Sequence, residues 1–352
     1  MSWTAVRTVA VLELRQRVRS TRWRVMLIVW GVVLVLLCGG LTALAGMSGG
    51  RHEEIVPILY DLTLGFVLGI GLIVAPTLSA TSINGDRADA TLALLQATAL
   101  RSHEIVVGKL LAAWLAALAF LAVAAPFLLA FTMTGGASWT ALVGHLLILA
   151  VSLGAVCAVG LGLSAATARP SASAVLTYLV VTALVIGTPI MMTLSTTAVH
   201  GKQRSIVYST DYDESTNNKQ VCEKDPDIYT SDIVHWERIW WMLVPNPFVA
   251  LGDVSARAPV TDLDPRTSYS PLRELGLSVD TMRTPQPAEM VSYYCGNNSH
   301  STWDDDVRRP EHLVFWPATL LVLGLLGAWS LVSASRRLRT PVRTLARGTR
   351  VA

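Results

Sequence analysis

The stretch NGDRADATLALLQATALRSHEIVVGK, residues 84–109, decides how the chain is organised. It gathers charged side chains, whereas the sequence on either side is apolar enough to lie in a bilayer. Asp86 and Asp89 precede an apolar face, an order that favours the start of a helix. Arg101 and Ser102 break this first helix, and Glu104 opens a second one. The stretch therefore predicts a helix–turn–helix that connects two membrane spans.

The composition outside this stretch is that of an integral membrane protein. The chain is 52% hydrophobic and only 15% charged over 352 residues, with a mean hydropathy of +0.48. Soluble domains are nearer to about a quarter charged. A membrane-spanning helix needs about 20 mostly apolar residues. Six stretches meet this length, at residues 25–46, 57–80, 105–134, 139–167, 171–197 and 313–335.

Arginine and lysine are distributed unevenly between the loops, and this sets the orientation. The short loops 47–56 and 135–138 hold only Arg51. Basic residues are retained on the cytoplasmic side, so we predict a multi-pass bacterial plasma membrane protein with both termini in the cytoplasm. The basic inner face suits anionic membrane lipids rather than nucleic acid. Its basic residues are Arg7, Arg15, Arg17, Arg19, Arg22, Arg24, Arg87, Arg101, Lys109, Arg169, Arg336, Arg337, Arg339, Arg343, Arg347 and Arg350.

The predicted spans divide the chain into five parts. The first contains a basic amphipathic helix at residues 5–19, which either lies in the plane of the membrane interface or only orients the first span. The parts are the N-terminal cytoplasmic helix (1–24), spans one to five with the cytoplasmic loop 84–104 (25–197), an extracellular segment (198–312), the sixth span (313–335) and a basic cytoplasmic tail (336–352).

The extracellular segment contains a tryptophan-rich stripe. Ile233, Trp236, Trp240 and Val244 recur at helical spacing before Pro245, which predicts a helix over residues 233–244. Such a stripe is typical of a helix at the outer membrane interface. A helix buried in a small soluble domain would show the same pattern, and both interpretations stay open.

The four cysteines fall into two pairs. Cys222 and Cys295 lie in the extracellular segment, where an oxidising environment favours a disulfide between them. Closing a loop of this length would stabilise the segment by roughly 4 kcal/mol in the chain-entropy model. Cys38 and Cys157 lie in spans, and we interpret them as apolar packing residues.

The polar residues of the spans do not predict an enzyme or a metal site. Each His-Glu pair, at 52–53 and 103–104, lacks the second histidine that a helical zinc site needs. Residues 162–166, GLSAA, nearly match a serine-nucleophile elbow, but His145 of the same span lies about 28 Å away along a helix. We interpret Ser164 as a packing residue, His145 as satisfied within the bundle and Asp61 as interfacial rather than an ion relay.

Several parts of the opening stretch resemble the signature loop of ABC-2-type transporter permeases. These parts are Asp86-Arg87, Ala90-Thr91-Leu92, Leu94-Leu95, Ala97-Thr98-Ala99-Leu100, Glu104-Ile105 and Gly108-Lys109-Leu110. In that family an acidic-basic pair leads into GTLELLLATPLS…EIVLGKLL. Ala90 replaces the usual glycine, and Ala99 replaces the usual proline. Residues 236–253, WERIWWMLVPNPFVALGD, are similar to a segment found before the last span in actinobacterial members.

The resemblance implies an all-α polytopic permease with the six-helix ABC-2 (type V-like) exporter fold and an extracellular insertion between helices five and six. It implies a homo- or heterodimer of permeases with separate ATPase subunits, which bind ATP and Mg. The chain itself has no G-x-x-x-x-G-K-[ST] phosphate cradle. The family's coupling helix maps onto Asp86, Arg87, Asp89, Thr91, Leu94, Leu95, Arg101 and Glu104, and its outer gate onto Trp236, Trp240, Trp241 and Pro245.

Three functions therefore follow from the sequence alone. The first is a permease that exports a lipid, glycan, peptide or drug-like substrate, with no catalytic or metal site and no cofactor of its own. The second is a proton-coupled secondary transporter, which would need buried ionisable residues. The third is a membrane-anchored sensor or assembly scaffold, which would explain the extracellular segment. For residues 84–104 themselves, the alternative interpretation is an ordinary loop between spans with a solvated charged face.

Overall fold

Six long helices dominate the structure, as predicted. The computed structural model describes residues 2–47, 52–88, 100–216, 219–222, 225–258, 269–294 and 310–339, with the backbone alone at residues 52–54, 210–216, 219–222, 293 and 339. The helices that are long and apolar enough to cross a membrane are Thr21–Met47, Ile55–Ala88, Ser102–Met133, Trp139–Ala166, Pro170–Ala198 and Trp316–Leu338.

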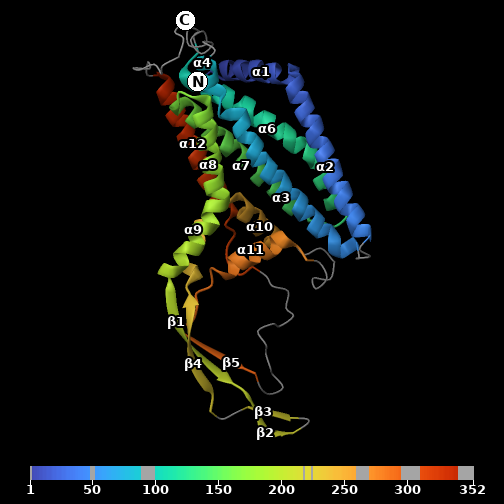
Figure 1. Cartoon of the computed structure of the whole chain (residues 1–352), viewed down its shortest axis with the longest axis vertical. Coiled ribbons are helices and arrows are strands. Elements are labelled where there is room, and N and C mark those ends of the chain that lie inside the picture. Colours follow the sequence, from blue (N-terminus) through green and yellow to red (C-terminus); the bar gives the residue numbers. More distant parts are fainter. Residues whose placement is uncertain are drawn as a thin grey trace.

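These helices lie side by side in a bundle (Figure 1). The fourth span is the most central, with 67% of its most apolar window buried, against 17% in the first span and 11% in the fifth. The bundle consists of α2 (Thr21–Met47), α3 (His52–Ser79), α6 (Ser102–Met133), α7 (Trp139–Ala166), α8 (Pro170–Thr182) and α12 (Trp316–Arg339).

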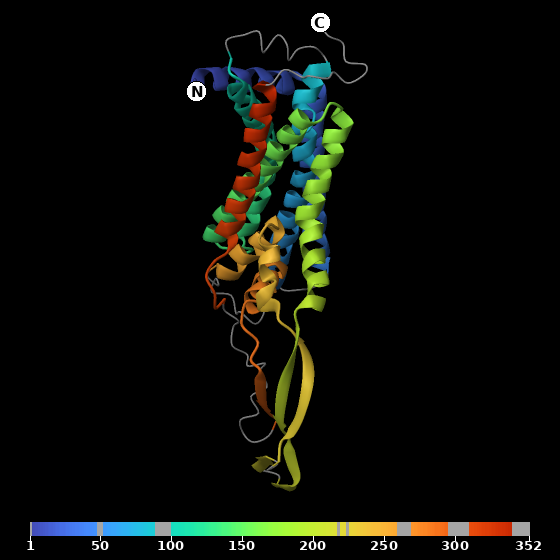
Figure 2. The same cartoon turned by 90° about the vertical axis from the view of Figure 1, so that its left-hand side faces the viewer.

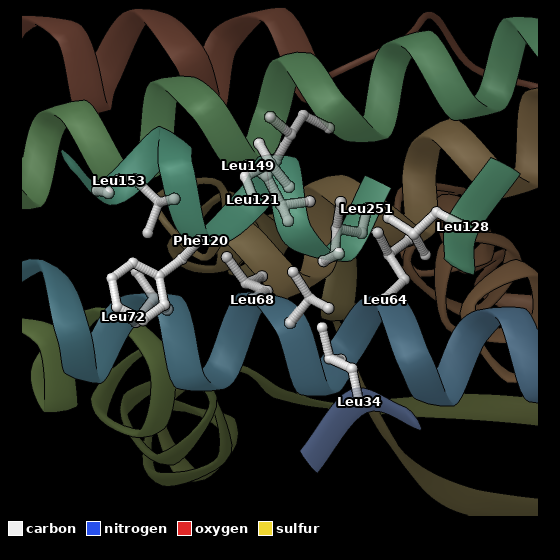
Figure 3. Close-up of a cluster of buried hydrophobic side chains, with 14 of the residues drawn as sticks. Leu34, Leu64, Leu68, Leu72, Phe120, Leu121, Leu128, Leu149, Leu153 and Leu251 are labelled. Carbon is white, nitrogen blue, oxygen red and sulfur yellow. The ribbon is translucent and has the colours of Figure 1, made fainter. Parts of the chain in front are cut away.

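The core of the bundle forms where α3, α6 and α7 meet (Figure 3). Leu64, Leu68 and Leu72 follow one another every four residues and share one face of α3. They belong to the same buried cluster as Phe120 of α6 and Leu149 of α7. Between apolar helices in lipid, association depends on van der Waals packing and on small residues that allow close approach. Buried alanines of α6 provide this approach, among them Ala113, Ala116, Ala117 and Ala124.

Two short helices lie at one end of the bundle, which we call the α1 end. The helix α1 (Trp3–Arg19) runs across this end, roughly perpendicular to the spans, in both views (Figures 1 and 2). The helix α4 (Ser82–Ala88) follows α3 at the same end. Both described ends of the chain are found here, because the chain begins with α1 and the C-terminal end of α12 reaches the same end of the bundle. Residues 5–19 are helical, as the sequence predicted.

The fifth span runs on towards the opposite end, which we call the sheet end. From α8 it continues through a π-helical turn (Ala183–Gly187), α9 (Thr188–Ser195) and a 3₁₀ turn (Thr196–Ala198). The strand β1 (His200–Tyr208) then pairs antiparallel with β4 (Asp227–Val234) and parallel with β5 (Glu289–Tyr293). The strands β2 (Thr210–Thr216) and β3 (Lys219–Cys222) form a separate antiparallel pair. These strands project well beyond the bundle (Figure 2).

The predicted helix over residues 233–244 is wrong. Ile233 and Val234 belong to β4, where they pair with Gly201 and His200. Two 3₁₀ turns follow, η3 (Trp236–Arg238) and η4 (Trp240–Leu243). The β-branched pair at the start of the stripe suits a strand, and pairing with β1 overrides the helical spacing of the tryptophans. The sequence did not predict any of the strands.

Two further helices close the sheet end of the bundle. These are α10 (Pro247–Arg257) and α11 (Pro271–Thr281), which pack on each other. Each begins with proline after a capping side chain, Asn246 or Ser270, an arrangement that favours a helix start. The helix α10 also packs against α7 and α12, and α11 against α3. They occupy the junction between the spans and the projecting strands (Figure 1).

Candidate functional site

A buried lysine joins three helices at the α1 end. The Nζ atom of Lys109 in α6 forms ion pairs with Glu13 of α1 and with Asp86 of α4, the latter at 2.7 Å. The lysine side chain is 1% exposed, whereas Glu13 and Asp86 are 18% and 25% exposed. A buried cation is tolerated when it is paired and hydrogen-bonded. Lys109 therefore ties α1 and α4 to the start of the third span, and we call these three elements the platform.

Gly108, the residue before Lys109, explains how α1 approaches α6 so closely. A Cβ atom on Gly108 would lie 2.7 Å from the Cβ of Val9 and 3.1 Å from the carbonyl oxygen of Val6. The two helix backbones are thus nearly in contact at this point. Val6, Val9 and Ala10 are the buried residues of α1. The Gly-Lys pair supplies both the space for α1 and the charge that holds it.

Replacing Gly108 with alanine is expected to lift α1 from the platform, because Val9 and the α1 backbone would have to move. Overpacking of this kind costs about 1–3 kcal/mol. Hydrogen exchange of residues 3–19 is expected to rise by tenfold or more. Gly65→Ala is the matched control, since a Cβ there meets nothing within 4 Å. Equal α1 protection in both variants would show that Gly108 does not seat this helix.

Glu104 secures the beginning of both α6 and α1. Its Oε1 accepts a hydrogen bond from the backbone nitrogen of Ser2 at 2.6 Å, and its Oε2 accepts one from the backbone nitrogen of Arg101 at 3.1 Å. Arg101 is the N-cap residue of α6 and its side chain is exposed. The carboxylate satisfies donors at a helix start, where negative charge is favourable. Glu104 thus faces the protein, and Arg101 faces outward.

The helix α4 is held by side chains from α7 and α8. The hydroxyl of Ser164 accepts hydrogen bonds from the backbone nitrogens of Ile83 and Asn84, at 3.0 and 3.1 Å. Ser164 therefore caps α4 from a neighbouring helix, and the interpretation of it as a packing residue misses this role. Asn84 also donates to the hydroxyl of Ser173 at 2.7 Å. Arg87 donates to the carbonyl of Ala165 at 3.3 Å.

Four of the eight predicted coupling residues lie in the described part of the chain. Asp86 and Glu104 make internal contacts, Arg87 reaches the end of α7, and Arg101 is exposed. Asp89, Thr91, Leu94 and Leu95 lie outside the described residues, so their coupling role stays a prediction. Glu13 and Lys109 were missed as site residues. A lysine between Val107 and Leu110 in an apolar helix was the available signal.

The predicted gate residues lie at the sheet end, in different surroundings. Trp236 and Trp240 pack against a cluster of buried residues that includes Ile239, Leu243 and Phe315. Trp240 also lies 4.6 Å below the guanidinium of Arg283. Trp241 is 58% exposed. Trp236 and Trp240 are thus partly buried against the core of the sheet end, whereas Trp241 is exposed and available to lipid or to a partner.

Pro245 and the cysteines complete the set of predicted positions. Pro245 precedes Asn246, the N-cap residue of α10. Cys38 and Cys157 are buried free thiols, as expected for packing residues. Only the backbone of Cys222 is described, and Cys295 lies outside the described residues. The Cys222–Cys295 disulfide therefore stays a prediction.

Charged side chains fix the start of the last span at the sheet end. The Oδ2 atom of Asp253 accepts hydrogen bonds from the backbone nitrogens of Phe315 and Trp316, at 2.8 and 2.9 Å. Its Oδ1 accepts from Arg257 at 2.8 Å. Arg257 also pairs with Asp280 at 3.0 Å. This cluster joins α10 to α11 through an ion pair and α10 to the start of α12 through hydrogen bonds.

Asp280 gives this cluster a pH dependence. Burial alone would raise the pKa of Asp280, but hydrogen bonds from Glu311 and His312 and the charge of Arg257 outweigh it and lower the pKa below its ordinary value of 3.8. The carboxylate is hydrogen-bonded in the folded protein, at 2.6 Å from the backbone nitrogen of Glu311.

A lowered pKa in the folded state means that Asp280 stabilises the fold above its unfolded pKa, and that this stability is lost as the pH falls through the folded pKa. We expect hydrogen exchange of residues 271–281 to increase selectively below about pH 4. The Asp280→Asn variant should lose this acid-dependent step. The same step in both proteins would assign the acid response to another group.

The comparisons with known proteins do not assign this platform. No family model matches the chain, and no curated protein matches it. In the described part of the chain, no group of three or more His, Cys, Asp or Glu side chains could hold a metal ion. The geometry of the platform and of the sheet end therefore carries the functional argument.

Proposed function

We propose that this chain is the membrane-spanning permease subunit of an ATP-driven exporter of the ABC-2 type, powered by a separate ATPase subunit. The observation that carries the proposal is the Lys109 cluster, which joins Glu13 and Asp86 to the third span. Gly108, Lys109, Asp86 and Glu104 belong to the signature-like stretch, and these same residues build the platform. The resemblance and the packing thus select the same residues.

The platform can transmit force because it is connected to several spans, with a turn at residues 80–81 between α3 and α4. The helices α3 and α4 belong to one long segment, Ile55–Ala88. Ser164 and Ser173 bind the α4 segment to the fourth and fifth spans. A push on α4 would therefore be passed to the second span and, through these hydrogen bonds, to the fourth and fifth spans. ATP and Mg would be bound by the partner, and Arg101 with its outward side chain would face that partner.

The same geometry supports an orientation with the α1 end in the cytoplasm. Both described ends of the chain lie there, with the arginines of α1. Arg7, Arg15 and Arg19 are exposed, and together with exposed Trp3 and Val18 they suit anionic lipid at a membrane interface. The projecting strands would then lie outside the cell. Exported lipid, glycan, peptide or drug-like molecules are the substrate classes that fit the family resemblance.

A proton-coupled transporter is less well supported. Such a mechanism needs ionisable groups along the pathway. In the described spans, Asp61 and His145 contact α11 and α10 at the sheet end. Glu104 and Lys109 contact the α1 segment at the other end. The described stretches between these two groups hold no Asp, Glu, His, Lys or Arg. The buried charged groups also form ion pairs or hydrogen bonds with nearby residues. They are not arranged in a row along which protons could pass.

Copurification and transport measurements test the proposal. We expect the tagged chain, when it is purified from its native membrane, to carry with it a subunit that binds ATP analogues. The reconstituted pair should transport only with hydrolysable ATP. A chain that transports under a proton gradient without this subunit would instead be a secondary transporter. A chain that recruits partners but moves no solute would be a sensor or scaffold.

A further inference from the structure

The strand β4 forms one edge of the projecting sheet. β1 lies between β4 and β5, and the strands extend well beyond the bundle (Figure 2). All eight residues of β4 belong to the strand that pairs antiparallel with β1. In the described part of the chain, no strand pairs with the other side of β4. Such an edge presents a row of backbone N–H and C=O groups that can pair with another chain.

The hydrogen-bond pattern shows which backbone groups of β4 point to this open side. Arg204 of β1 lies opposite Thr230, but its N–H donates to the carbonyl of Ala288, just before β5, at 2.9 Å. The N–H of Arg204 therefore points away from β4. In an antiparallel ladder, hydrogen-bonded and non-hydrogen-bonded pairs alternate. Thr230 is thus in a non-hydrogen-bonded pair, and the backbone groups of Ile228, Thr230 and Asp232 point outward.

β4 lacks the features that protect an edge strand from pairing. Natural edges are very short, or carry lysine, proline or a β-bulge. The sequence of β4, DIYTSDIV, contains no lysine, proline or glycine, and its register with β1 is continuous. The opposite edge, β5, has only five residues and follows Pro287, whose carbonyl accepts a hydrogen bond from the side chain of Gln203 at 2.7 Å. β4 is therefore the edge that is suited to pairing.

Exposed apolar side chains lie on both faces of this edge. Ile228 and Tyr229 are each 54% exposed, and successive side chains of a strand point to opposite faces. Ile228 lies in one row with Ile206 of β1 and Val291 of β5. Cross-strand pairs of this kind stabilise a sheet. A strand added beside β4 would extend the apolar row by one further pair.

The charged residues of this edge are acidic. Asp225, Asp227 and Asp232 are all exposed. Asp232 lies opposite Lys202 of β1, whereas Asp227 lies opposite Val207 and has no basic residue across the ladder. Complementary charge steers and orients a partner. The edge therefore favours a basic polypeptide and repels the phosphates of anionic lipids.

We propose that β4 is a docking edge for an extended, basic polypeptide segment of another protein, which joins the sheet as an additional antiparallel strand. Backbone hydrogen bonds to residues 228, 230 and 232 would supply the affinity, and alternate side chains the specificity. Basic residues of the partner would lie beside Asp227, and apolar ones beside Ile228 and Tyr229. Antiparallel pairing is slightly more stable per residue than parallel pairing. This inference goes beyond the proposed function, because it involves neither ATP nor an ATPase.

A synthetic strand tests the edge in the purified full-length chain. The probe is the fluorescein-labelled peptide VKTTVVK. Its lysines would lie opposite Asp232 and Asp227, and its valines opposite Ile233, Tyr229 and Ile228. Excess peptide is expected to slow hydrogen exchange of residues 227–234 at least fivefold. The charge-reversed peptide VETTVVE should bind at least tenfold more weakly, and this difference should shrink in high salt. Unchanged exchange in β4, or equal affinity for the two peptides, overturns the proposal.

Variants of β4 test whether the peptide pairs with the strand itself. Thr230→Pro removes an outward N–H but no hydrogen bond to β1, a position at which edge strands accept proline. It is expected to weaken peptide binding at least tenfold, whereas Thr230→Val, which keeps the N–H, should bind like the parent. Ile228→Lys leaves the backbone unchanged and should also weaken binding tenfold, so the test does not depend on the proline variant. Unaltered binding in both variants rejects the proposal. A dimer of the chain that Thr230→Pro abolishes, without peptide binding to the parent, would make a second copy the occupant and also overturn it.

Discussion

Replacing Lys109 with methionine is expected to cause a loss of ATP-driven transport of at least tenfold, while the six spans stay folded. Methionine replaces the apolar stem of lysine but removes the cation that Glu13 and Asp86 share. Breaking a buried ion pair by removing one partner costs about 3–5 kcal/mol. We expect the lower end of this range, because the two carboxylates are 18% and 25% exposed and are partly hydrated.

The loss of stability in the Lys109→Met variant should appear at the platform rather than across the whole protein. Hydrogen exchange of α1 and α4 is expected to rise, with little change in α7 and α12. Adding Glu13→Gln and Asp86→Asn to the Lys109→Met variant removes the two carboxylate charges that had paired with Lys109 and should restore much of the α1 protection. Retained protection and transport in the single variant would mean that Lys109 does not hold the platform together.

Replacing Asp253 with alanine is expected to destabilise the sheet end by about 3 kcal/mol or more. The side chain is 1% exposed and pairs with Arg257, which is 16% exposed. Its loss therefore leaves a partly buried guanidinium with fewer partners. It also removes the cap of α12 at Phe315 and Trp316, which is worth about 1 kcal/mol. Arg257 keeps Asp280 as a partner, and this limits the loss.

An exposed ion pair in the same segment is the matched control. Arg204 and Glu289 lie 3.2 Å apart, with their side chains 52% and 57% exposed. Removing Arg204 is expected to cost less than about 1 kcal/mol, because solvent screens such pairs. Unfolding titrations of both variants in mixed detergent micelles would compare the two losses. Similar losses would show that the Asp253 cluster is not a principal support of the sheet end.

Much of the bundle could be predicted because each span is a local property of the sequence. About 20 apolar residues in a row make a helix in lipid, whatever they pack against. The basic amphipathic pattern of residues 5–19 likewise predicted α1, which is observed. The importance of the stretch at residues 84–109 followed from its charges. These features depend on neighbouring residues and not on distant partners.

The features that the sequence did not predict all depend on contacts between distant segments of the chain. β1 is stabilised by β4 and β5, and the partner strand β5 lies about 80 residues further along the chain. Asp61 reads as an isolated interfacial acid until Ser270 and Leu272 are placed beside it. Lys109 reads as a basic flank of the third span until Glu13 folds back across the bundle. In each case the local pattern gave the residue type but not its partner.

Site-specific photocrosslinking from Arg101 tests the central claim most directly. Arg101 is exposed beside the platform, and Tyr269, 59% exposed at the sheet end, is the control position. We predict that a crosslinker at position 101 captures a subunit that binds radiolabelled ATP, that one at position 269 does not, and that the capture falls in the Lys109→Met variant. A nucleotide-binding partner captured only from position 269, or labelling of position 101 by an impermeant reagent added outside intact cells, would contradict the account.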